Sequence, residues 1–248
     1  MKSWLKLCLG VLFLFTLHRI IFINIFYPSG GTIPFENILF SILYGLRFDV
    51  SLLAYFTIIP LLITLVGYLF FSIDSSELIH RSLFFGHTCI FLISVALTLF
   101  IDIGFYIEFN TRINYLAIEY LQNVDTIIET IFQVFPYKIL FIFMVAIVLT
   151  IPFILFKYFT THPGTFINKF SVKQVFLTVL ISIIAIRGGL QNEPLSWGDA
   201  SISKHSLINH AGMNPIWNIG YSFFNSDPVR ENKKFQKIDI DLPNAADL

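Results

Sequence analysis

Charged side chains inside long apolar stretches are the residues of this sequence that could carry chemistry. Each charge is costly in hydrocarbon, so each is expected to have an ion-pair partner or a polar ligand. The set comprises Arg19, Arg47, Asp49, Asp102, Glu108, Arg112 and Arg187. Guanidinium groups match phosphate through paired hydrogen bonds, so one chemistry that this set predicts is recognition of an anionic lipid headgroup.

Two interpretations of these charges are open. In the functional one, four arginines bind or orient the headgroup, namely Arg19, Arg47, Arg112 and Arg187. The carboxylates then hold the guanidinium groups in place; they are Asp49, Asp102 and Glu108. In the structural one, the charges form ion pairs that lock the helices together, such as Arg47 with Asp102 or Arg19 with Asp49.

The sequence around Arg187 favours the functional interpretation for that residue. Arg187 is followed directly by Gly188 and Gly189, then by Leu190 and Gln191, with Pro194 close behind. Two glycines allow a sharp backbone turn and can expose amide groups to an anion. The simpler alternative is a glycine that only terminates a helix.

Other chemistry is not indicated. The sequence contains no Walker A loop, no dinucleotide fingerprint and no Gly-x-Ser-x-Gly elbow. His205 and His210 lack a third defined ligand, so no metal site is predicted. With none of the catalytic motifs present, no catalytic residue is predicted either. Cys8 and Cys89 lie in separate apolar runs and are interpreted as buried hydrophobic residues. Sixteen basic residues balance sixteen acidic ones, so no nucleic-acid partner is predicted.

Membrane-spanning helices are the elements expected to position these charges. Hydrophobic residues make up 56% of the 248 residues and charged residues 13%, whereas soluble proteins carry about 25% charge. This composition excludes an ordinary soluble enzyme and a disordered regulator. Five stretches reach or approach the roughly 20 apolar residues that a crossing needs: 4–26, 48–71, 83–107, 138–155 and 174–186. We therefore expect an all-α membrane domain over residues 1–187.

Lysine and arginine in the connecting loops predict the orientation. With the N-terminus inside, the inner side carries six of them and the outer side two, Arg112 and Lys138. Five spans then place the C-terminus outside. In this arrangement the buried charges gather near the outer ends of the spans.

Two further segments are predicted to be interfacial helices. Residues 35–46 would form a separate helix, with a break near Gly45, because joining them to 48–71 gives a helix longer than a bilayer is thick. Residues 112–135 repeat apolar side chains at helical spacing and are expected to lie flat on the outer leaflet. A helix packed on the bundle exterior is the alternative.

Residues 188–248 differ in composition from the rest of the chain. They are polar and rich in Asn, Ser, Asp and Pro, and they contain no further apolar stretch of spanning length. We expect a mostly irregular extracytoplasmic tail, with a hydrophilic linker from Asp227 onward.

Taken together, these features resemble the N-terminal membrane region of lipoteichoic acid synthase-like proteins, membrane-anchored sulfatase relatives that include phosphoglycerol transferases. The resemblance covers nearly the whole chain. It lies in the five spans, in Arg47-Phe48-Asp49, and above all in Arg187-Gly188-Gly189-Leu190-Gln191 with Pro194. Asn209, Ala211 and Asn214-Pro215 in the tail add to it.

The resemblance implies a bacterial cytoplasmic membrane protein whose relatives carry an extracytoplasmic domain of the alkaline-phosphatase type. That domain holds a divalent metal (Mn, Mg or Ca) and a Thr nucleophile, and it acts on lipid-linked or ester substrates. The sequence given stops at Leu248, so we expect the membrane half of such an enzyme, which anchors it and positions an anionic lipid. A stand-alone membrane interaction protein with a protein partner and a small transporter are the alternatives.

Overall fold

The computed structural model describes residues 2–70, 77–120, 125, 129, 135–161 and 172–225. These residues form helices and connecting segments, with no strand among them, so the all-α prediction is confirmed for this part of the chain. The long helices are α1 (Lys2–Ile25), α2 (Phe35–Phe70), α3 (Glu77–Phe109), α6 (Phe135–Thr161) and α7 (Val172–Ile186). The short ones are α4 (Leu116–Tyr120), the 3₁₀ helix η3 (Trp197–Ala200), α8 (Ser206–Gly212) and α9 (Pro215–Asn225).

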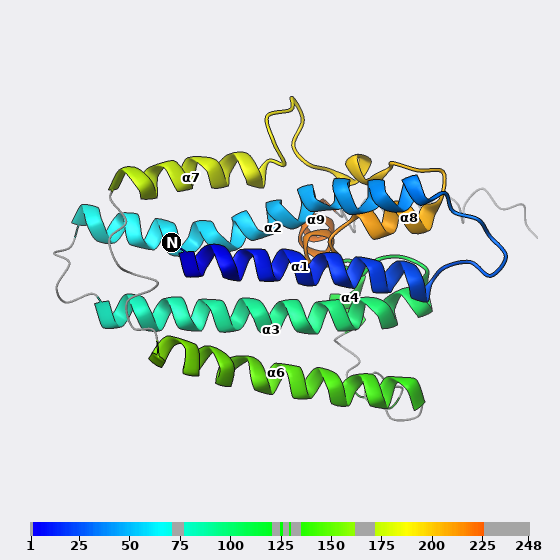
Figure 1. The fold of residues 1–248 in the computed structure, drawn as a ribbon, viewed down its shortest axis with the longest axis horizontal. Helices are drawn as coiled ribbons and strands as arrows, with labels where there is room; N and C mark the ends of the chain where they lie inside the picture. Colours follow the sequence, from blue (N-terminus) through cyan, green and yellow to red (C-terminus); the bar gives the residue numbers. More distant parts are fainter. Residues whose placement is uncertain are drawn as a thin grey trace, which may run out of the picture.

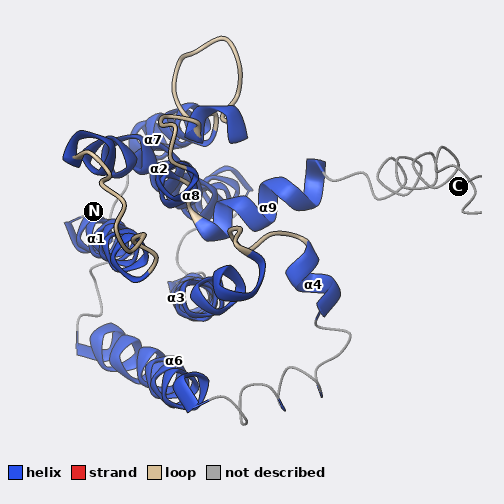
Figure 2. Cartoon of the chain, turned by 90° about the vertical axis from the view of Figure 1, so that its right-hand side faces the viewer, coloured by secondary structure: helices blue, strands red, loops and turns tan. Residues whose placement is uncertain are grey.

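The five long helices run along a common axis (Figure 1). Helix α7 packs against α2 and α6 against α3, while α1 and α3 each also contact α2 (Figures 1 and 2). Among the described residues, three helical stretches have the length and apolar character of a membrane crossing: Leu5–Ile25, Phe35–Leu62 and Phe85–Phe109. The other two predicted spans correspond to shorter apolar stretches, Phe141–Lys157 and Lys173–Ile186.

Large apolar side chains cover the outer surface of the bundle. Phe13 on α1, Ile90 on α3 and Phe153 on α6 are each about two-thirds exposed. The interior holds a smaller cluster of Val11, Phe15, Leu53, Phe56 and Val95. A water-soluble bundle has the opposite distribution, so this surface is typical of helices that face lipid.

Helix α2 continues without interruption through Gly45, so the predicted break there is wrong. Glycine serves a different purpose at this position. The Arg19 guanidinium lies directly against it, and a Cβ built on Gly45 would overlap Arg19 Cζ. Gly45 is therefore a site of close helix approach, and residues 35–46 belong to the same helix as the predicted second span.

Pro60 lies inside α2 and deprives the helix of one backbone donor. The carbonyl that this donor would have reached belongs to Phe56. Nε2 of His87 on α3 lies 2.9 Å from that oxygen, and the His87 and Phe56 rings stack with their centroids 4.5 Å apart. His87 thus compensates for the proline across the helix interface.

The predicted helix over 112–135 begins later than expected. Helix α3 ends at Phe109, where Asn110 adopts a left-handed conformation with φ 51°. Residues 112–114 are then non-helical, and helix resumes at Leu116. Most of 121–134 lies outside the described residues, as does the linker from Asp227.

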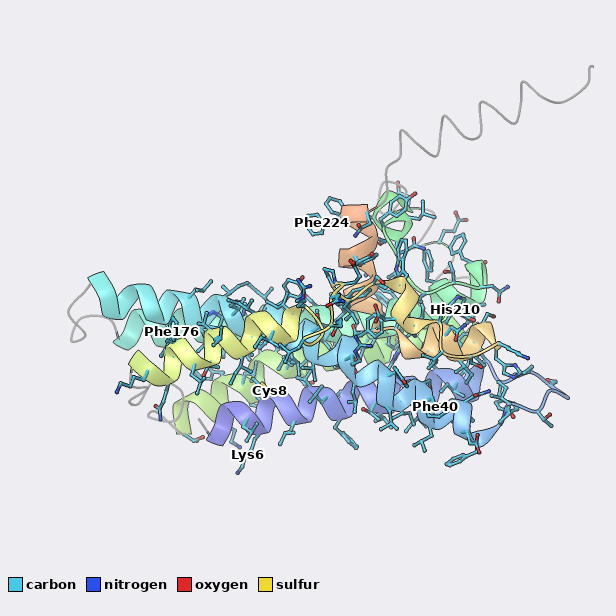
Figure 3. The ribbon with its side chains drawn as sticks, turned by 90° about the horizontal axis from the view of Figure 1, so that it is seen from above. Lys6, Cys8, Phe40, Phe176, His210 and Phe224 are labelled. Atoms are coloured by element: carbon cyan, nitrogen blue, oxygen red, sulfur yellow. The ribbon has the colours of Figure 1, made fainter. Side chains whose placement is uncertain are left out.

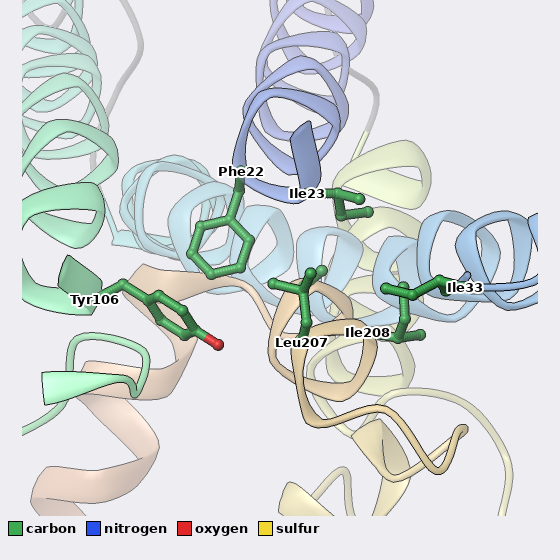
Figure 4. Close-up of a cluster of buried hydrophobic side chains, with 7 residues drawn as sticks. Phe22, Ile23, Ile33, Tyr106, Leu207 and Ile208 are labelled. Atoms are coloured by element: carbon green, nitrogen blue, oxygen red, sulfur yellow. The ribbon is translucent and has the colours of Figure 1, made fainter. Parts of the chain in front are cut away.

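The prediction of a mostly irregular tail is wrong for residues 195–225, which we call the cap. Helix α8 buries Leu207, Ile208 and Ala211 in a cluster with residues of α1 and α3 (Figure 4). Burying one such leucine or isoleucine is worth about 1.5–3 kcal/mol. The apolar residues of α8 lie on one buried face, so this part of the cap folds onto the bundle instead of extending away from it.

Candidate functional site

Arg19 and Asp49 form a fully buried ion pair between α1 and α2. Arg19 Nη2 donates to both Asp49 carboxylate oxygens at 3.0 and 3.1 Å, and the side chains are 2% and 0% exposed. Arg19 Nε donates to the Ala211 carbonyl oxygen of the cap at 2.8 Å. One guanidinium therefore joins two spans and the end of α8.

Arg112 and Asp102 form a second buried pair of the same design. Arg112 Nη1 donates to Asp102 Oδ2 at 2.5 Å, and Nη2 donates to the Met213 carbonyl at 2.7 Å. The other Asp102 oxygen accepts the Ile113 amide at 3.2 Å. The Arg112 guanidinium also lies 4.2 Å from the centre of the Phe22 ring. Burial, its largest cause, lowers the pKa of Arg112 from its usual value.

The two pairs meet at the break between α8 and α9. Ala211 and Met213 are the residues there whose carbonyls accept guanidinium hydrogen bonds. Asn214 completes the junction: Nδ2 donates to Asp49 at 2.8 Å, while Oδ1 accepts the amides of Ile216 and Trp217. A non-helical junction inside a membrane domain requires such internal partners, because lipid offers none.

Asn214 was not among the predicted site residues, although the sequence contains a signal for it. Asparagine followed by proline is a typical start of a helix, with Asn as the N-cap and Pro in the first helical position. Here Asn214 directly precedes α9, which begins at Pro215. What the sequence could not indicate is that the amide of the same side chain reaches Asp49.

Two histidines border these pairs. His18 Nε2 lies 2.9 Å from the Leu99 carbonyl oxygen and 3.6 Å from Asp102 Oδ2. His210 Nδ1 lies 3.1 Å from the Tyr106 hydroxyl. Burial, and then the nearby charge of Arg112, lower the pKa of His210. Both effects disfavour the protonated form of His210, which would place a third positive charge near the two arginines.

Arg47 lies only two residues before Asp49 in the sequence, but it does not pair with that carboxylate. Arg47 Nη2 pairs with Asp199 of η3 at 3.2 Å, with the side chains 33% and 25% exposed. Its Nε points at the Gly188 carbonyl at 3.4 Å. The alternative pairing of Arg47 with Asp102 is wrong, since Asp102 pairs with Arg112.

Arg187 is exposed and stabilises the turn that follows α7. Its guanidinium donates to the carbonyls of Gln191 and Asn192, and its own carbonyl accepts the Leu195 amide at 3.1 Å. Gly188 and Gly189 have φ values of +82° and +132°, which glycine adopts readily. Arg47 and Arg187 thus flank one glycine turn at the surface.

The predicted site residues therefore separate into two groups. Arg19, Asp49, Asp102 and Arg112 lie together in the interior, and Arg47, Arg187, Gly188 and Gly189 lie together at the surface. Glu108 lies exposed in the last turn of α3. The interior group can hold the cap backbone in position through hydrogen bonds. The arginines of the surface group are accessible enough to bind a ligand from solvent or lipid.

Comparison with known proteins finds no matching family model, no matching curated protein and no matching solved structure. Within the described residues, no three His, Cys, Asp or Glu side chains are grouped closely enough to hold a metal ion.

Proposed function

We propose that this protein is a membrane-anchoring domain that holds its cap in a fixed position on the membrane bundle. The proposal depends on the observation that each buried guanidinium group bonds to two different parts of the chain. Arg19 and Arg112 each join a carboxylate of a candidate span to a backbone carbonyl of the cap. Releasing the cap would leave both ion pairs in place but would break the hydrogen bonds from Arg19 to the Ala211 carbonyl and from Arg112 to the Met213 carbonyl. Buried donors and acceptors that lose their partners are unfavourable.

Lipid positioning is the second part of the proposal, and Arg47 and Arg187 are the residues that would perform it. Both retain solvent-accessible guanidinium surface beside the glycine turn. Their partners include carbonyl oxygens that an anionic headgroup could replace. Arg19 and Arg112 are each at most 2% exposed, so their part in lipid binding would be indirect, through the cap.

At the family level, we propose the membrane region of a lipoteichoic acid synthase-like or phosphoglycerol transferase-type protein in a bacterial cytoplasmic membrane, with the C-terminus outside. The glycine turn after Arg187 and the ordered cap agree with a domain that presents a following segment at the membrane surface. The divalent metal and the nucleophile would belong to that segment. A stand-alone membrane interaction protein remains the second candidate, because the cap would serve a bound partner equally well.

Proteolysis in membrane vesicles tests the anchoring proposal. The wild-type cap should resist protease added from the cap side, whereas Arg112→Gln should become cleavable within 195–225. Both should remain in the membrane after alkaline carbonate extraction. Lys204→Ala removes an exposed cation from the same cap and should behave as wild type. Cleavage of the wild-type cap at the variant's rate would overturn the proposal.

A further inference from the structure

Helix α9 crosses the axis of the bundle instead of following it. Figure 3 shows it standing sideways from the long helices, with Phe224 at its far tip, and the end-on view of Figure 2 agrees. Its near side buries Trp217, Asn218 and Ser222. Phe223 and Phe224 at the tip are 59% and 85% exposed.

The segment after α3 joins α9 in this sideways projection. The Tyr115 amide donates to Ser222 Oγ at 2.8 Å, and Asn218 Nδ2 donates to the Ile113 carbonyl at 2.9 Å. We call residues 113–118 together with α9 the side lobe. Its exposed large apolar side chains are Leu116, Ile118, Phe223 and Phe224.

The side lobe leaves the bundle at the depth of a membrane crossing. Trp217 of α9 packs edge-on against Phe48 of α2, with ring centroids 4.7 Å apart. A crossing of about 20 residues, placed anywhere within the 28 residues of Phe35–Leu62, includes Phe48. A structure that projects sideways from this level meets the leaflet, not bulk water.

Aromatic side chains at the base of the lobe indicate the same depth. Trp217 stacks on Tyr221, and Trp197 contacts Tyr221 in an edge-on arrangement. Trp197 is 45% exposed, and its indole nitrogen donates to Asn218 Oδ1 at 2.7 Å. Tryptophan and tyrosine with an apolar body and a satisfied polar group are typical of the membrane–water interface.

We infer that the side lobe is a lipid-binding surface that lies in the interface of the leaflet on the cap side. Phe223, Phe224, Leu116 and Ile118 insert among the upper acyl chains, and the polar groups of the lobe stay bonded to one another or face the headgroups. The partner is the bilayer. The inference rests on the membrane-anchoring part of the proposed function, and it adds a contact beside the spans that fixes the height and rotation of the cap.

Spin-label accessibility tests this inference on the full chain in vesicles of phosphatidylglycerol and phosphatidylcholine. Cys8 and Cys89 are first replaced by alanine, and single labels are then attached through Phe224→Cys, Ile90→Cys and Lys204→Cys. Ile90 is 68% exposed within a candidate span and reports the lipid environment. Lys204 is exposed before α8 and reports water. Collisions with oxygen and with a water-soluble nickel chelate are measured for each label.

We expect the label at 224 to collide often with oxygen and rarely with nickel, as the label at 90 does. A nickel collision rate equal to that at 204 would place the α9 tip in water and overturn the inference. Low rates with both reagents would indicate contact with protein, either a second copy or a partner, and would overturn it as well. A label at 90 that is open to nickel would instead contradict membrane anchoring itself.

Discussion

The Asp49 carboxylate on α2 accepts two hydrogen bonds from Arg19 on α1 and a third from Asn214 in the cap, all between 2.8 and 3.1 Å. Three separate parts of the chain therefore meet at one fully buried acid. Arg112 and Asp102 form a second buried pair beside it. The two pairs bond to backbone and side-chain groups of the cap, which explains how a polar C-terminal segment can pack against an apolar bundle.

Removing one partner of the Arg112–Asp102 pair is expected to cost more stability than replacing both partners. Arg112→Met should lower the free energy of unfolding by about 3–5 kcal/mol, because it leaves Asp102 as a buried charge without its partner. The double variant Arg112→Met, Asp102→Leu should recover part of this loss. Thermal unfolding in detergent measures both. Arg47→Met is the comparison: its partly exposed pair with Asp199 should contribute about 1 kcal/mol or less. Equal losses for the single and double variants would contradict a specific coupling.

Gly45→Ala should destabilise the bundle, because the new methyl group would overlap the Arg19 guanidinium. Arg19 cannot move away without lengthening its bonds to Asp49 and Ala211, so the expected cost is about 1–3 kcal/mol. Gly10→Ala on α1 is the matched control, since a Cβ there meets nothing within 4 Å. That variant should be neutral or slightly stabilising. If the two alanine variants unfold at the same temperature, the close approach at Gly45 has no energetic role.

His87 is expected to matter because of Pro60. His87→Ala should be destabilising in the wild-type chain, since the Phe56 carbonyl loses a hydrogen bond in the interior. In a Pro60→Ala background the restored amide can donate to the same carbonyl, so the same histidine change should cost less. A double-mutant cycle by thermal unfolding measures the difference. A coupling energy near zero would contradict the claim that His87 compensates for Pro60.

Stability should fall in mildly acidic solution because of His210. Its pKa is lowered in the folded protein by burial and by Arg112, whereas the unfolded chain has a value of about 6.5. The unfolded state therefore binds more protons below that pH. The histidine's stabilising contribution is complete above about 6.5 and declines as the pH falls toward the folded value. His210→Gln should reduce this slope in unfolding temperature between pH 7 and 5. An unchanged slope would show that other groups are responsible.

Anionic lipid should remain bound to the purified protein through Arg187 and Arg47. Native mass spectrometry with phosphatidylglycerol and phosphatidylcholine should show preferential retention of the anionic lipid. Arg187→Ala should weaken that preference, because a guanidinium forms charge-assisted hydrogen bonds with phosphate. Lys204→Ala, which removes one positive charge from the cap and leaves the glycine turn intact, should not. Equal retention of both lipids by the wild-type protein would contradict headgroup selection at the glycine turn.

The sequence predicts the helical class, and it indicates that charges in apolar runs need partners, because both follow from local patterns. Apolar length identifies a spanning helix, and a charge in such a run has few possible partners. The Arg19–Asp49 pair was among the pairings that this reasoning suggested. The other example, Arg47 with Asp102, is wrong, because Arg47 pairs with Asp199. Residues two apart point to nearly opposite sides of a helix, so Arg47 faces η3 and the glycine turn while Asp49 faces α1.

The remaining differences arise from contacts between distant parts of the chain. Arg112 fits the polar face of a surface helix when its neighbours alone are considered, yet the turn at Asn110 directs it to Asp102. The polar composition of the cap and the shortness of its helices predict an irregular segment. Its folded form depends on Ala211, Met213 and Asn214 meeting charges that lie more than a hundred residues away or on other helices.

Hydrogen–deuterium exchange of the cap tests the central claim most directly. If buried guanidinium groups hold α8 and α9 on the bundle, amides within 206–218 should exchange slowly in detergent micelles, and Arg112→Gln should accelerate them while leaving the middle of α1 protected. Rapid exchange of these amides in the wild-type protein would contradict the account, because it would mean that the cap is not held on the membrane domain.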